Sequence, residues 1–525
     1  MKALTLAAAL TLGTCLTAPC QAQTTTETAP MDLTFERVFA SPGLDGPTPR
    51  KVKLSPDGRY LTVLRNREAD RERYDLWAYD RNAGEWAMLV DSEALGSGRD
   101  LSEDEKMQRE RARVGSLKGI IDYQWTKDAS GVLVPLDGDL YLARLGGETV
   151  QLTDTEESEL NPALSNTGAY VSFVRDRRLW VGETGGETQP VTPKEGEDVR
   201  WGEAEFVAQE EMARLTGYWW SPDDRRVAVE RFDESMVGIV TRAAIGATGT
   251  KVFDQRYPVA GSENADVELY VMDPDGNNRI KVDLAAHQQP GIYTEGDPTD
   301  FYLARVDWAP DGSALYVQRQ NREQTVLDML KVDPETGAAT PVFTEKAAVA
   351  DYWINLGDDY KLLDNGDLVW WSERDGYGHL YLYSAGDDWQ DARQLTRGAF
   401  VVSKLVGVDQ TAKRLFYLAT SAEDPLEQHI YSLDYADPAA QPQRLTEAGY
   451  THSATMDGKG QTLVITRSND DTPPHSYIAD QQGERLAWIE ENALDADHPY
   501  APYLASHRPT QYGTIEAEDG TPLYW

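Results

Sequence analysis

The sequence predicts an all-β protein, an eight-bladed β-propeller, and three observations lead to this prediction. A hairpin turn of the Ser-Pro-Asp-Gly kind recurs along the chain. The clean spacings between these turns are about 40 to 50 residues, the length of a four-stranded propeller blade. Alternating apolar residues, which are typical of strands, fall into eight groups. The groups are residues 51–90, 118–153, 158–193, 218–286, 303–344, 351–397, 400–448 and 450–490.

The recurring turn joins an apolar strand end to a second strand of alternating apolar residues. Proline presets the backbone of the second turn position, and Asp and Gly suit the other positions, so the pattern indicates hairpins. The occurrences are 54–58 (L-S-P-D-G), 125–128 (W-T-K-D), 164–168 (L-S-N-T-G), 220–223 (W-S-P-D), 308–312 (W-A-P-D-G) and 456–458 (M-D-G).

The composition is that of a globular protein with a strongly acidic surface. A chain of 525 residues is too long for one ordinary hydrophobic core and would normally hold two or more domains. Of these residues 40% are apolar, and the chain has 26 Tyr and 14 Trp. The 50 Lys and Arg against 88 Asp and Glu give a net charge of −38. That charge repels nucleic acid and anionic lipid and favours cationic partners. We therefore expect no nucleic-acid partner and no membrane partner.

Residues 1–22 have the form of a secretory signal peptide, and residues 23–50 are a predicted lead-in segment. Lys2 supplies the positive start, residues 3–17 form a short apolar core, and 20–22 (C-Q-A) offer a small-residue cleavage site. Both cysteines, Cys15 and Cys20, lie in the signal, so the mature chain would hold no disulfide and no cysteine metal site. We expect a periplasmic or secreted protein.

The blade spacing fails in two places, and each excess predicts an inserted element. Between the first and second turns lies a charged helical run, residues 103–113, and between the turns at 220 and 308 lie the extra residues 233–261. The propeller is predicted to span residues 51–500. After it, residues 511–525 read as a strand, an Asp-Gly turn and a second strand, which predicts one more hairpin.

Residues 204–220 (A-E-F-V-A-Q-E-E-M-A-R-L-T-G-Y-W-W) set a short helix into this β-rich chain. Residues 205–214 are good helix formers, and Thr216 and Gly217 are predicted to stop the helix. Two adjacent carboxylates, Glu210 and Glu211, lie on it. Neighbouring side chains on a helix diverge by about 100 degrees, so both can bind one ligand only near a helix end or bend. A solvated helix face is the alternative.

Residues 209–212 (Q-E-E-M) and 216–222 (T-G-Y-W-W-S-P) resemble the dipeptidyl peptidase IV family of serine peptidases, in the prolyl oligopeptidase clan. The resemblance implies that Glu210 and Glu211 bind the α-ammonium group of peptide substrates with a free N-terminus. The chemistry fits, because an ammonium has three donors and no acceptor, and two carboxylates plus one further oxygen saturate it. Eight-bladed closure also matches the family.

A second resemblance concerns residues 109–113 (R-E-R-A-R), whose last arginine in the family contacts the backbone carbonyl of the second substrate residue. By position that residue is Arg113. Its fork of donors could bind both the carbonyl and one glutamate of the pair, and so hold the empty site together. Arg109 and Arg111 are then expected at the surface. An exposed mixed-charge helix is the alternative for the whole run.

A third resemblance, at residues 255–261 (Q-R-Y-P-V-A-G), marks an arm on the fourth blade that the family commonly uses in dimer contacts. It implies an arm near residues 236–253 and a homodimer of the full-length enzyme, although a disordered loop is an equal alternative. In the family, residues 501–525 would open an α/β-hydrolase catalytic domain. We therefore expect the sequence to be truncated near the start of that domain.

The sequence holds no catalytic site of this clan. The Gly-x-Ser-x-Gly turn of the nucleophile does not occur, and the seven histidines lack metal-ligand spacing and are expected at turns or at the surface. We predict no catalytic residue, no metal and no cofactor in this chain. By resemblance the whole enzyme is a serine-type dipeptidyl peptidase that releases X-Pro or X-Ala dipeptides. The alternatives are a non-catalytic peptide- or protein-binding propeller and an acylaminoacyl or endo-acting relative.

Overall fold

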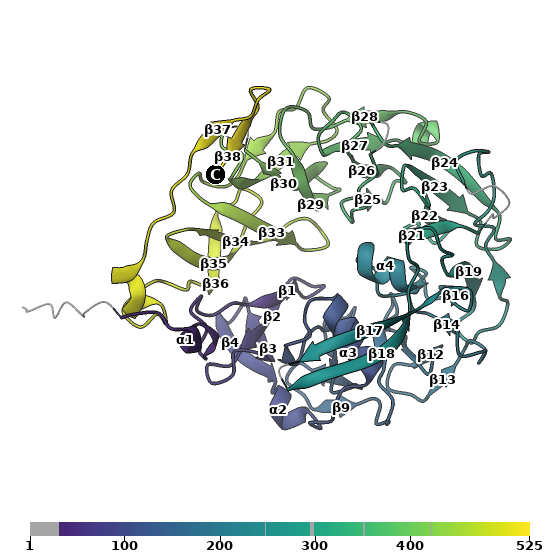
Figure 1. Cartoon of the computed structure of the whole chain (residues 1–525), viewed down its shortest axis with the longest axis horizontal. Coiled ribbons are helices and arrows are strands. Elements are labelled where there is room, and N and C mark those ends of the chain that lie inside the picture. The colour runs from purple at the N-terminus through teal and green to yellow at the C-terminus, as the bar shows by residue number, and fades with distance from the viewer. Residues whose placement is uncertain (1–30, 247, 294–298, 350–351, 422) are drawn as a thin grey trace, which may run out of the picture.

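The protein is described by a computed structural model that covers residues 31–246, 248–293, 299–349, 352–421 and 423–525. The expected signal peptide, residues 1–22, and the first residues of the lead-in segment, 23–30, lie outside the described residues. Eight antiparallel sheets, each built on four strands, follow one another along the chain and stand in a ring (Figure 1). The predicted eight-bladed β-propeller is thereby confirmed.

The first four blades contain the two predicted insertions. Blade 1 consists of β1 (Arg50–Leu54), β2 (Tyr60–Asn66), β3 (Arg73–Asp80) and β4 (Glu85–Val90). Blade 2 consists of β6 (Gln124–Trp125), β7 (Gly131–Leu136), β8 (Asp139–Arg144) and β9 (Thr149–Gln151). Blade 3 consists of β10 (Leu160–Leu164), β11 (Tyr170–Arg175), β12 (Arg178–Glu183) and β13 (Thr188–Pro190). Blade 4 consists of β14 (Val199–Trp201), β15 (Tyr218–Trp220), β16 (Val227–Asp233), β19 (Asp266–Met272) and β20 (Ile280–Lys281).

The last four blades are uninterrupted. Blade 5 consists of β21 (Phe301–Trp308), β22 (Leu315–Asn321), β23 (Val326–Val332) and β24 (Ala339–Lys346). Blade 6 consists of β25 (Lys361–Leu362), β26 (Leu368–Ser372), β27 (His379–Tyr383) and β28 (Ala392–Gln394). Blade 7 consists of β29 (Val402–Asp409), β30 (Arg414–Thr420), β31 (Gln428–Asp434) and β32 (Gln443–Arg444). Blade 8 consists of β33 (Thr451–Met456), β34 (Leu463–Asn469), β35 (Thr472–Ala479) and β36 (Arg485–Glu490).

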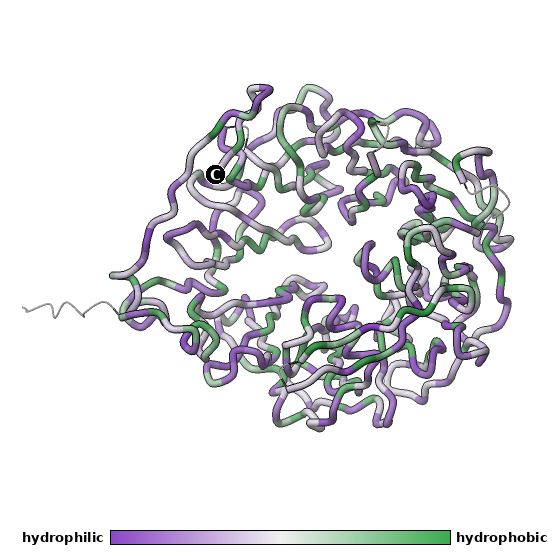
Figure 2. Tube along the Cα trace, viewed as in Figure 1, coloured by the Kyte–Doolittle hydropathy of each residue, from purple (hydrophilic) through white to green (hydrophobic). Residues whose placement is uncertain are grey.

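The core is divided among the contacts between neighbouring blades. Hydrophobic residues gather along the strands, whereas many connecting loops are hydrophilic (Figure 2). Blades 8 and 1 also share a cluster, in which Leu61 of β2 packs with Ile478 of β35 and Ile489 of β36. Every strand of blade 1 and of blade 8 comes from its own consecutive segment. The ring is therefore closed by side-chain packing and not by a strand shared between its two ends.

The recurring turns fix the first strand of a blade to its neighbour. In the turn of blade 4, the hydroxyl of Ser221 donates to the carboxylate of Asp223 at 2.8 Å. The preceding Trp220 donates its indole N–H to Ser172 Oγ of blade 3, at 2.9 Å. Trp125 of blade 2 makes the matching bond to Thr62 of blade 1, also at 2.9 Å. The tryptophan of the turn motif thus satisfies its polar atom in the adjacent blade.

Three histidines occupy buried strand positions, which corrects the expectation that all seven lie at turns or at the surface. His379, His429 and His452 are almost fully buried. Nδ1 of His429 lies 3.1 Å from Thr446 Oγ1, which also accepts the backbone N–H of Ile430 at 3.2 Å. The same arrangement of histidine and threonine recurs in blade 6. These histidines fill the core as hydrogen-bonded polar residues, which the sequence spacing did not indicate.

Blade 4 begins at Val199, and not at residue 218 as the sequence predicted. Both β14 and β15 pair with β16, so they are two halves of one first strand. The intervening residues 202–217 leave the strand and carry helix α4 (Phe206–Glu211). The blade was placed too late in the sequence because β14 is only three residues long. The insertion places α4 on the inner side of the ring (Figure 1).

The remaining elements lie outside the regular blades. Between blades 1 and 2 are α2 (Ser92–Leu95), α3 (Glu103–Arg111) and β5 (Lys118–Gly119). The predicted arm is a hairpin of β17 (Ile239–Gly246) and β18 (Gly249–Arg256) that pairs only with itself. The chain ends hold α1 (Phe35–Phe39), η2 (Ala501–Ser506) and the predicted hairpin of β37 (Thr514–Glu516) and β38 (Pro522–Tyr524). Among the described residues, no helix is long and apolar enough to cross a bilayer.

Candidate functional site

Helix α4 has an apolar face and an acidic face, and the sequence spacing determines both. Ala204, Ala208 and Met212 recur every four residues and pack against Ala304 of β21. The helix is capped at its start by Glu205, whose carboxylate accepts the N–H groups of residues 207 and 208. With the apolar face buried, the two glutamates at the end of the helix remain exposed.

The helix ends earlier than the sequence predicted, and Gly217 has a different role. Ala213 adopts a left-handed backbone with φ of 52°, and the N–H of Arg214 returns to the carbonyl of Ala208 at 3.0 Å. This is a helix-ending arrangement that usually contains glycine. A Cβ atom on Gly217 would lie 2.3 Å from the carbonyl oxygen of Glu203. Gly217 therefore allows the two ends of the insertion to approach closely.

A buried ion pair anchors the insertion to two blades. Arg214 pairs with Glu230 of β16, and both side chains are almost completely buried. The same guanidinium donates to the carbonyl oxygens of Thr216 at 2.9 Å and of Leu303 at 2.8 Å, and Leu303 belongs to blade 5. Burial raises the pKa of Glu230 to about 7. Arg214 thus fixes the position of α4 between blades 4 and 5.

The arginine at the acidic pair is Arg111 and not Arg113. Arg111 Nε donates to Glu210 Oε1 at 2.9 Å, and its Nη1 donates to Gln209 Oε1 at 2.5 Å. Only 11% of the Arg111 side chain is exposed, so its expected surface position is wrong. Arg109, which was also expected at the surface, is buried and pairs with Glu105.

Arg113 lies beyond the end of α3, in a left-handed backbone with φ of 57°. It is exposed, and its side chain forms no hydrogen bond or ion pair with any residue that the structure describes. The expected bond from Arg113 to the glutamate pair is therefore not present. Arg111 makes that bond because it is the last residue of the helix and faces α4. Contact between Arg113 and a bound peptide stays a prediction.

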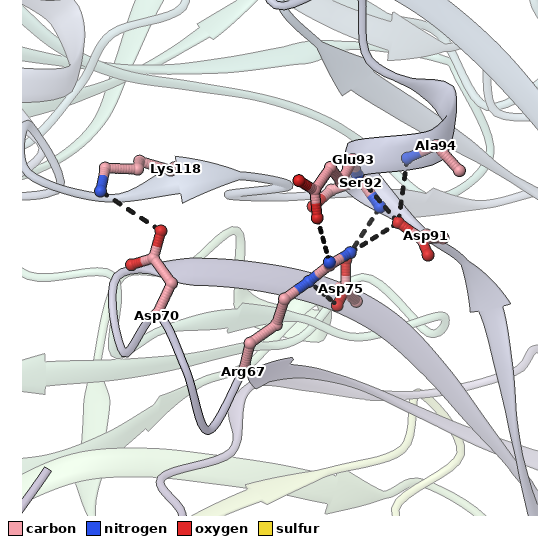
Figure 3. Close-up of polar contacts among 8 residues, drawn as sticks. All are labelled: Arg67, Asp70, Asp75, Asp91, Ser92, Glu93, Ala94 and Lys118. Atoms are coloured by element: carbon pink, nitrogen blue, oxygen red, sulfur yellow. Dashed lines mark hydrogen bonds and ion pairs between the residues drawn. The ribbon is translucent and has the colours of Figure 1, made fainter. Parts of the chain in front are cut away.

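The segment that carries Arg111 is tied to blade 1 at both of its ends (Figure 3). At its start, Arg67 binds Asp75 through Nε at 2.8 Å and also binds Asp91, which caps α2. At its end, Lys118 of β5 binds Asp70 at 3.3 Å. Because both ends are fixed on the edge of one blade, α3 is held at a defined distance from α4.

Glu211 faces a cavity of about 740 Å³ beside the helix. Its carboxylate forms no hydrogen bond or ion pair with any residue in the described part of the chain. The other lining residues are aromatic, amide and apolar residues together with one cation, Arg322. They include Phe206, Tyr257, Asn264, Tyr302, Gln320 and Trp353. An unpaired carboxylate next to aromatic walls suits a cationic ligand that carries an apolar side chain.

The sequence points to Glu210 and Glu211, but not to Arg111 at their side or to the cavity walls. The Q-R-Y-P segment that contains Tyr257 resembles the family's arm. The sequence does not show that Tyr257 lines the cavity beside Glu211. The described residues contain no group of three or more His, Cys, Asp or Glu side chains placed to hold a metal ion.

Comparison with known proteins relates this geometry to one family. The profile described as "Dipeptidyl peptidase IV (DPP IV) N-terminal region" matches residues 120–474, which is more than half of the chain. Dipeptidyl peptidase 8 of Mus musculus is 25% identical over 511 residues, which cover 81% of this chain and 56% of that protein. Probable dipeptidyl peptidase 4 of Emericella nidulans is 26% identical over 367 residues, covering 66% of this chain and 45% of that protein. The chain spans about half the length of these curated relatives.

Two solved structures share the fold. The crystal structure of Porphyromonas gingivalis dipeptidyl peptidase 4 gives a TM-score of 0.71 at 22% identity and covers 94% of this chain and 66% of that one. A putative dipeptidyl aminopeptidase IV from Bacteroides ovatus gives a TM-score of 0.63 at 21% identity and covers 92% and 66%. The profile match confirms the resemblance noted in the sequence, and the chain belongs to the dipeptidyl peptidase IV family through the N-terminal region of that family.

Proposed function

We propose that this chain is the substrate-binding propeller of a serine-type dipeptidyl peptidase, and that Glu210 and Glu211 bind the α-ammonium group of a peptide. The observation that carries the proposal is the carboxylate of Glu211, which lines the cavity without a partner among the described residues, beside a Glu210 that Arg111 holds in place. The net charge of −38 favours approach of a positively charged peptide end.

The two glutamates have different roles in this proposal. Arg111 already balances part of the charge of Glu210 and fixes its orientation. Glu211 supplies the carboxylate whose charge is not yet balanced, so it provides most of the attraction for the ammonium. Binding of the ammonium here places the second peptide bond of the substrate, and only that bond, at the nucleophile of the enzyme. Binding energy is thus used for orientation, and the enzyme removes two residues at a time.

Peptide binding to the chain of 525 residues tests the proposal. The probe is the tripeptide Ala-Pro-Ala, with its N-acetylated form as the comparison, measured by isothermal titration calorimetry. Hydrogen bonds to charged groups contribute about 1.5–3 kcal/mol, so E211Q should weaken binding of the free peptide roughly 10- to 100-fold. In a form of the enzyme that contains the catalytic residues, kcat/KM should fall by a similar factor in E210Q and in E211Q.

A matched control is E148Q, because Glu148 is an exposed glutamate on the loop between β8 and β9. It should leave the affinity unchanged. Equal binding of the free and acetylated peptides would refute the role of the acidic pair and would favour a relative that acts on blocked peptides.

The remaining features of the proposal come from the family. The full-length enzyme would release X-Pro or X-Ala dipeptides, would act in the periplasm or outside the cell, and would form a homodimer. The exposed arm of β17 and β18 supports the dimer, because Ile245 and Val252 are apolar and largely exposed on it. Sedimentation of the full-length enzyme would test the dimer.

A further inference from the structure

The arm on blade 4 reaches the acidic pair through a chain of aromatic contacts. Its root is pinned to the blade, because Arg256 binds Asp198 at 2.8 Å and also donates to the carbonyl of Val237 at 2.7 Å. The next residue, Tyr257, places its ring edge-on to the ring of Phe206, with centroids 5.0 Å apart. Phe206 is the first residue of α4. The root of the arm therefore contacts the helix that carries both glutamates.

Phe206 in turn supports the arginine of the site. The Arg111 guanidinium lies 5.2 Å from the centroid of the Phe206 ring. The same guanidinium binds Glu210 and Gln209 with its polar edge. Phe206 thus contacts Tyr257 as well as Arg111, and it limits the positions that the guanidinium can occupy.

The tip of the arm touches the segment that carries Arg111. Lys251 of β18 binds Glu103, the first residue of α3, at 2.9 Å. The arm crosses α3 in the view of Figure 1, in agreement with this contact. Both residues of the pair are exposed, so the tip adds little free energy by itself. It shows that the arm contacts α3 at the end opposite Arg111.

We propose that Tyr257 is a positioning residue for the acidic pair: acting through Phe206, it holds Arg111 against Glu210 and so fixes the carboxylates that receive the peptide ammonium. The inference rests on the proposed function of the pair. It adds that the arm is part of the substrate site, and that its root and the site are coupled within a single chain.

Two measurements on the chain of 525 residues test this inference, with Y257A and the ring-preserving Y257F as a matched pair. The first is amide hydrogen exchange of residues 103–114 in the free chain, which requires no ligand. The second is the affinity for Ala-Pro-Ala. From the strength of aromatic and cation–π contacts, Y257A should raise the exchange and weaken the affinity, each about three- to tenfold. Y257F should change neither value by more than about twofold, because it keeps the ring.

The inference requires both changes in Y257A. A loss of affinity with unchanged exchange would overturn it, because Tyr257 would then contact the peptide directly across the cavity. Faster exchange with unchanged affinity would also overturn it, since loosening of the Arg111 segment would then have no effect on the peptide site. Should the unmodified chain bind the acetylated peptide equally well, the proposed function fails, and the exchange measurement still decides whether Tyr257 positions Arg111.

Discussion

Blades 4 and 7 have the same strand plan, but blade 4 also carries the inserted helix α4 with Glu210 and Glu211, and the comparison shows how an insertion is tolerated. In blade 7 the strands β29 to β32 follow without interruption, and a buried polar position of the blade holds His429, whose Nδ1 lies 3.1 Å from Thr446 Oγ1. In blade 4 the first strand is broken, and the buried positions around the break hold the charged pair Arg214 and Glu230.

The break in blade 4 does not cost the blade its backbone hydrogen bonds. The N–H of Gly202 donates to the carbonyl of Glu230 at 3.0 Å, and the N–H of Glu230 donates to Gly217 at 2.7 Å. Gly217 also donates to Gly202 at 3.0 Å, which closes the base of the insertion. A propeller strand can therefore hold an insertion of sixteen residues (202–217), because Gly202 and Gly217 keep the backbone hydrogen bonds to the next strand at both ends of the insertion.

Loss of the buried charge pair in blade 4 should give the largest difference in stability between a substitution in blade 4 and one in blade 7. R214M keeps much of the side-chain volume but leaves Glu230 buried without its partner, which should destabilise the protein by about 3–5 kcal/mol. Arg414 of blade 7 is half-buried and donates to the hydroxyl of Ser432 at 2.8 Å, so R414M should cost only about 1 kcal/mol. Urea unfolding measures both variants. Equal midpoints would mean that the pair does not anchor the insertion, and the double variant R214M/E230M should recover most of the loss.

Acid should loosen the region of blades 7 and 8 before blade 4. Burial lowers the pKa of His452 to about 4, whereas an unfolded histidine titrates near 6.5. The stability from neutral His452 is complete above about pH 6.5 and is lost as the pH falls toward 4, with a limit of roughly 3 kcal/mol. In the insertion of blade 4, burial raises the pKa values of Glu203 and Glu205. Protonation of these two carboxyls at low pH therefore does not destabilise blade 4.

Amide exchange at pH 7 and pH 5, corrected for intrinsic rates, checks this pH dependence. Protection should fall more in β33 than in β16, and H452F should remove the difference. A uniform loss of protection across both blades would contradict the assignment to His452.

A glycine-to-alanine pair gives the smallest expected effect. G217A would place Cβ 2.3 Å from a backbone oxygen of Glu203, so the backbone must move, at about 1–3 kcal/mol. In blade 7, the three atoms nearest to a Cβ on residue 407 would all belong to the side chain of Met456, and the nearest, its sulfur, would lie at 2.9 Å. G407A should cost less than about 1 kcal/mol. Thermal unfolding of the two variants measures the difference. Equal midpoint temperatures would mean that residue 217 is no more closely packed than residue 407.

Much of the architecture was predictable from the sequence because the turns repeat. The recurring turn marked six of the eight blades, and the motif around Glu210 and Glu211 pointed to helix α4. The start of blade 4 was not predictable, since a strand of three residues (199–201) that resumes sixteen residues later has no alternating pattern.

The choice between Arg111 and Arg113 depended on the residue at which α3 ends. That helix has no apolar face that could reveal its rotation, so the sequence could not show which arginine faces α4. The buried histidines were missed for a related reason. His429 reads as a polar residue until a threonine seventeen residues later, Thr446, is known to lie beside it, just after the adjacent strand β32.

The contacts between blades 8 and 1 join the two ends of the propeller, so they bear on the order in which the protein folds during synthesis. Each blade consists of neighbouring residues, so a blade can form on the ribosome soon after its own segment emerges. Arg65 donates to the carbonyl of Ile489 across 424 positions of the chain, and Leu61 meets Ile478 beside it. These contacts cannot exist until the eighth blade has been synthesised. Closure of the ring therefore waits for the synthesis of strands β34 to β36, whatever order the earlier blades form in.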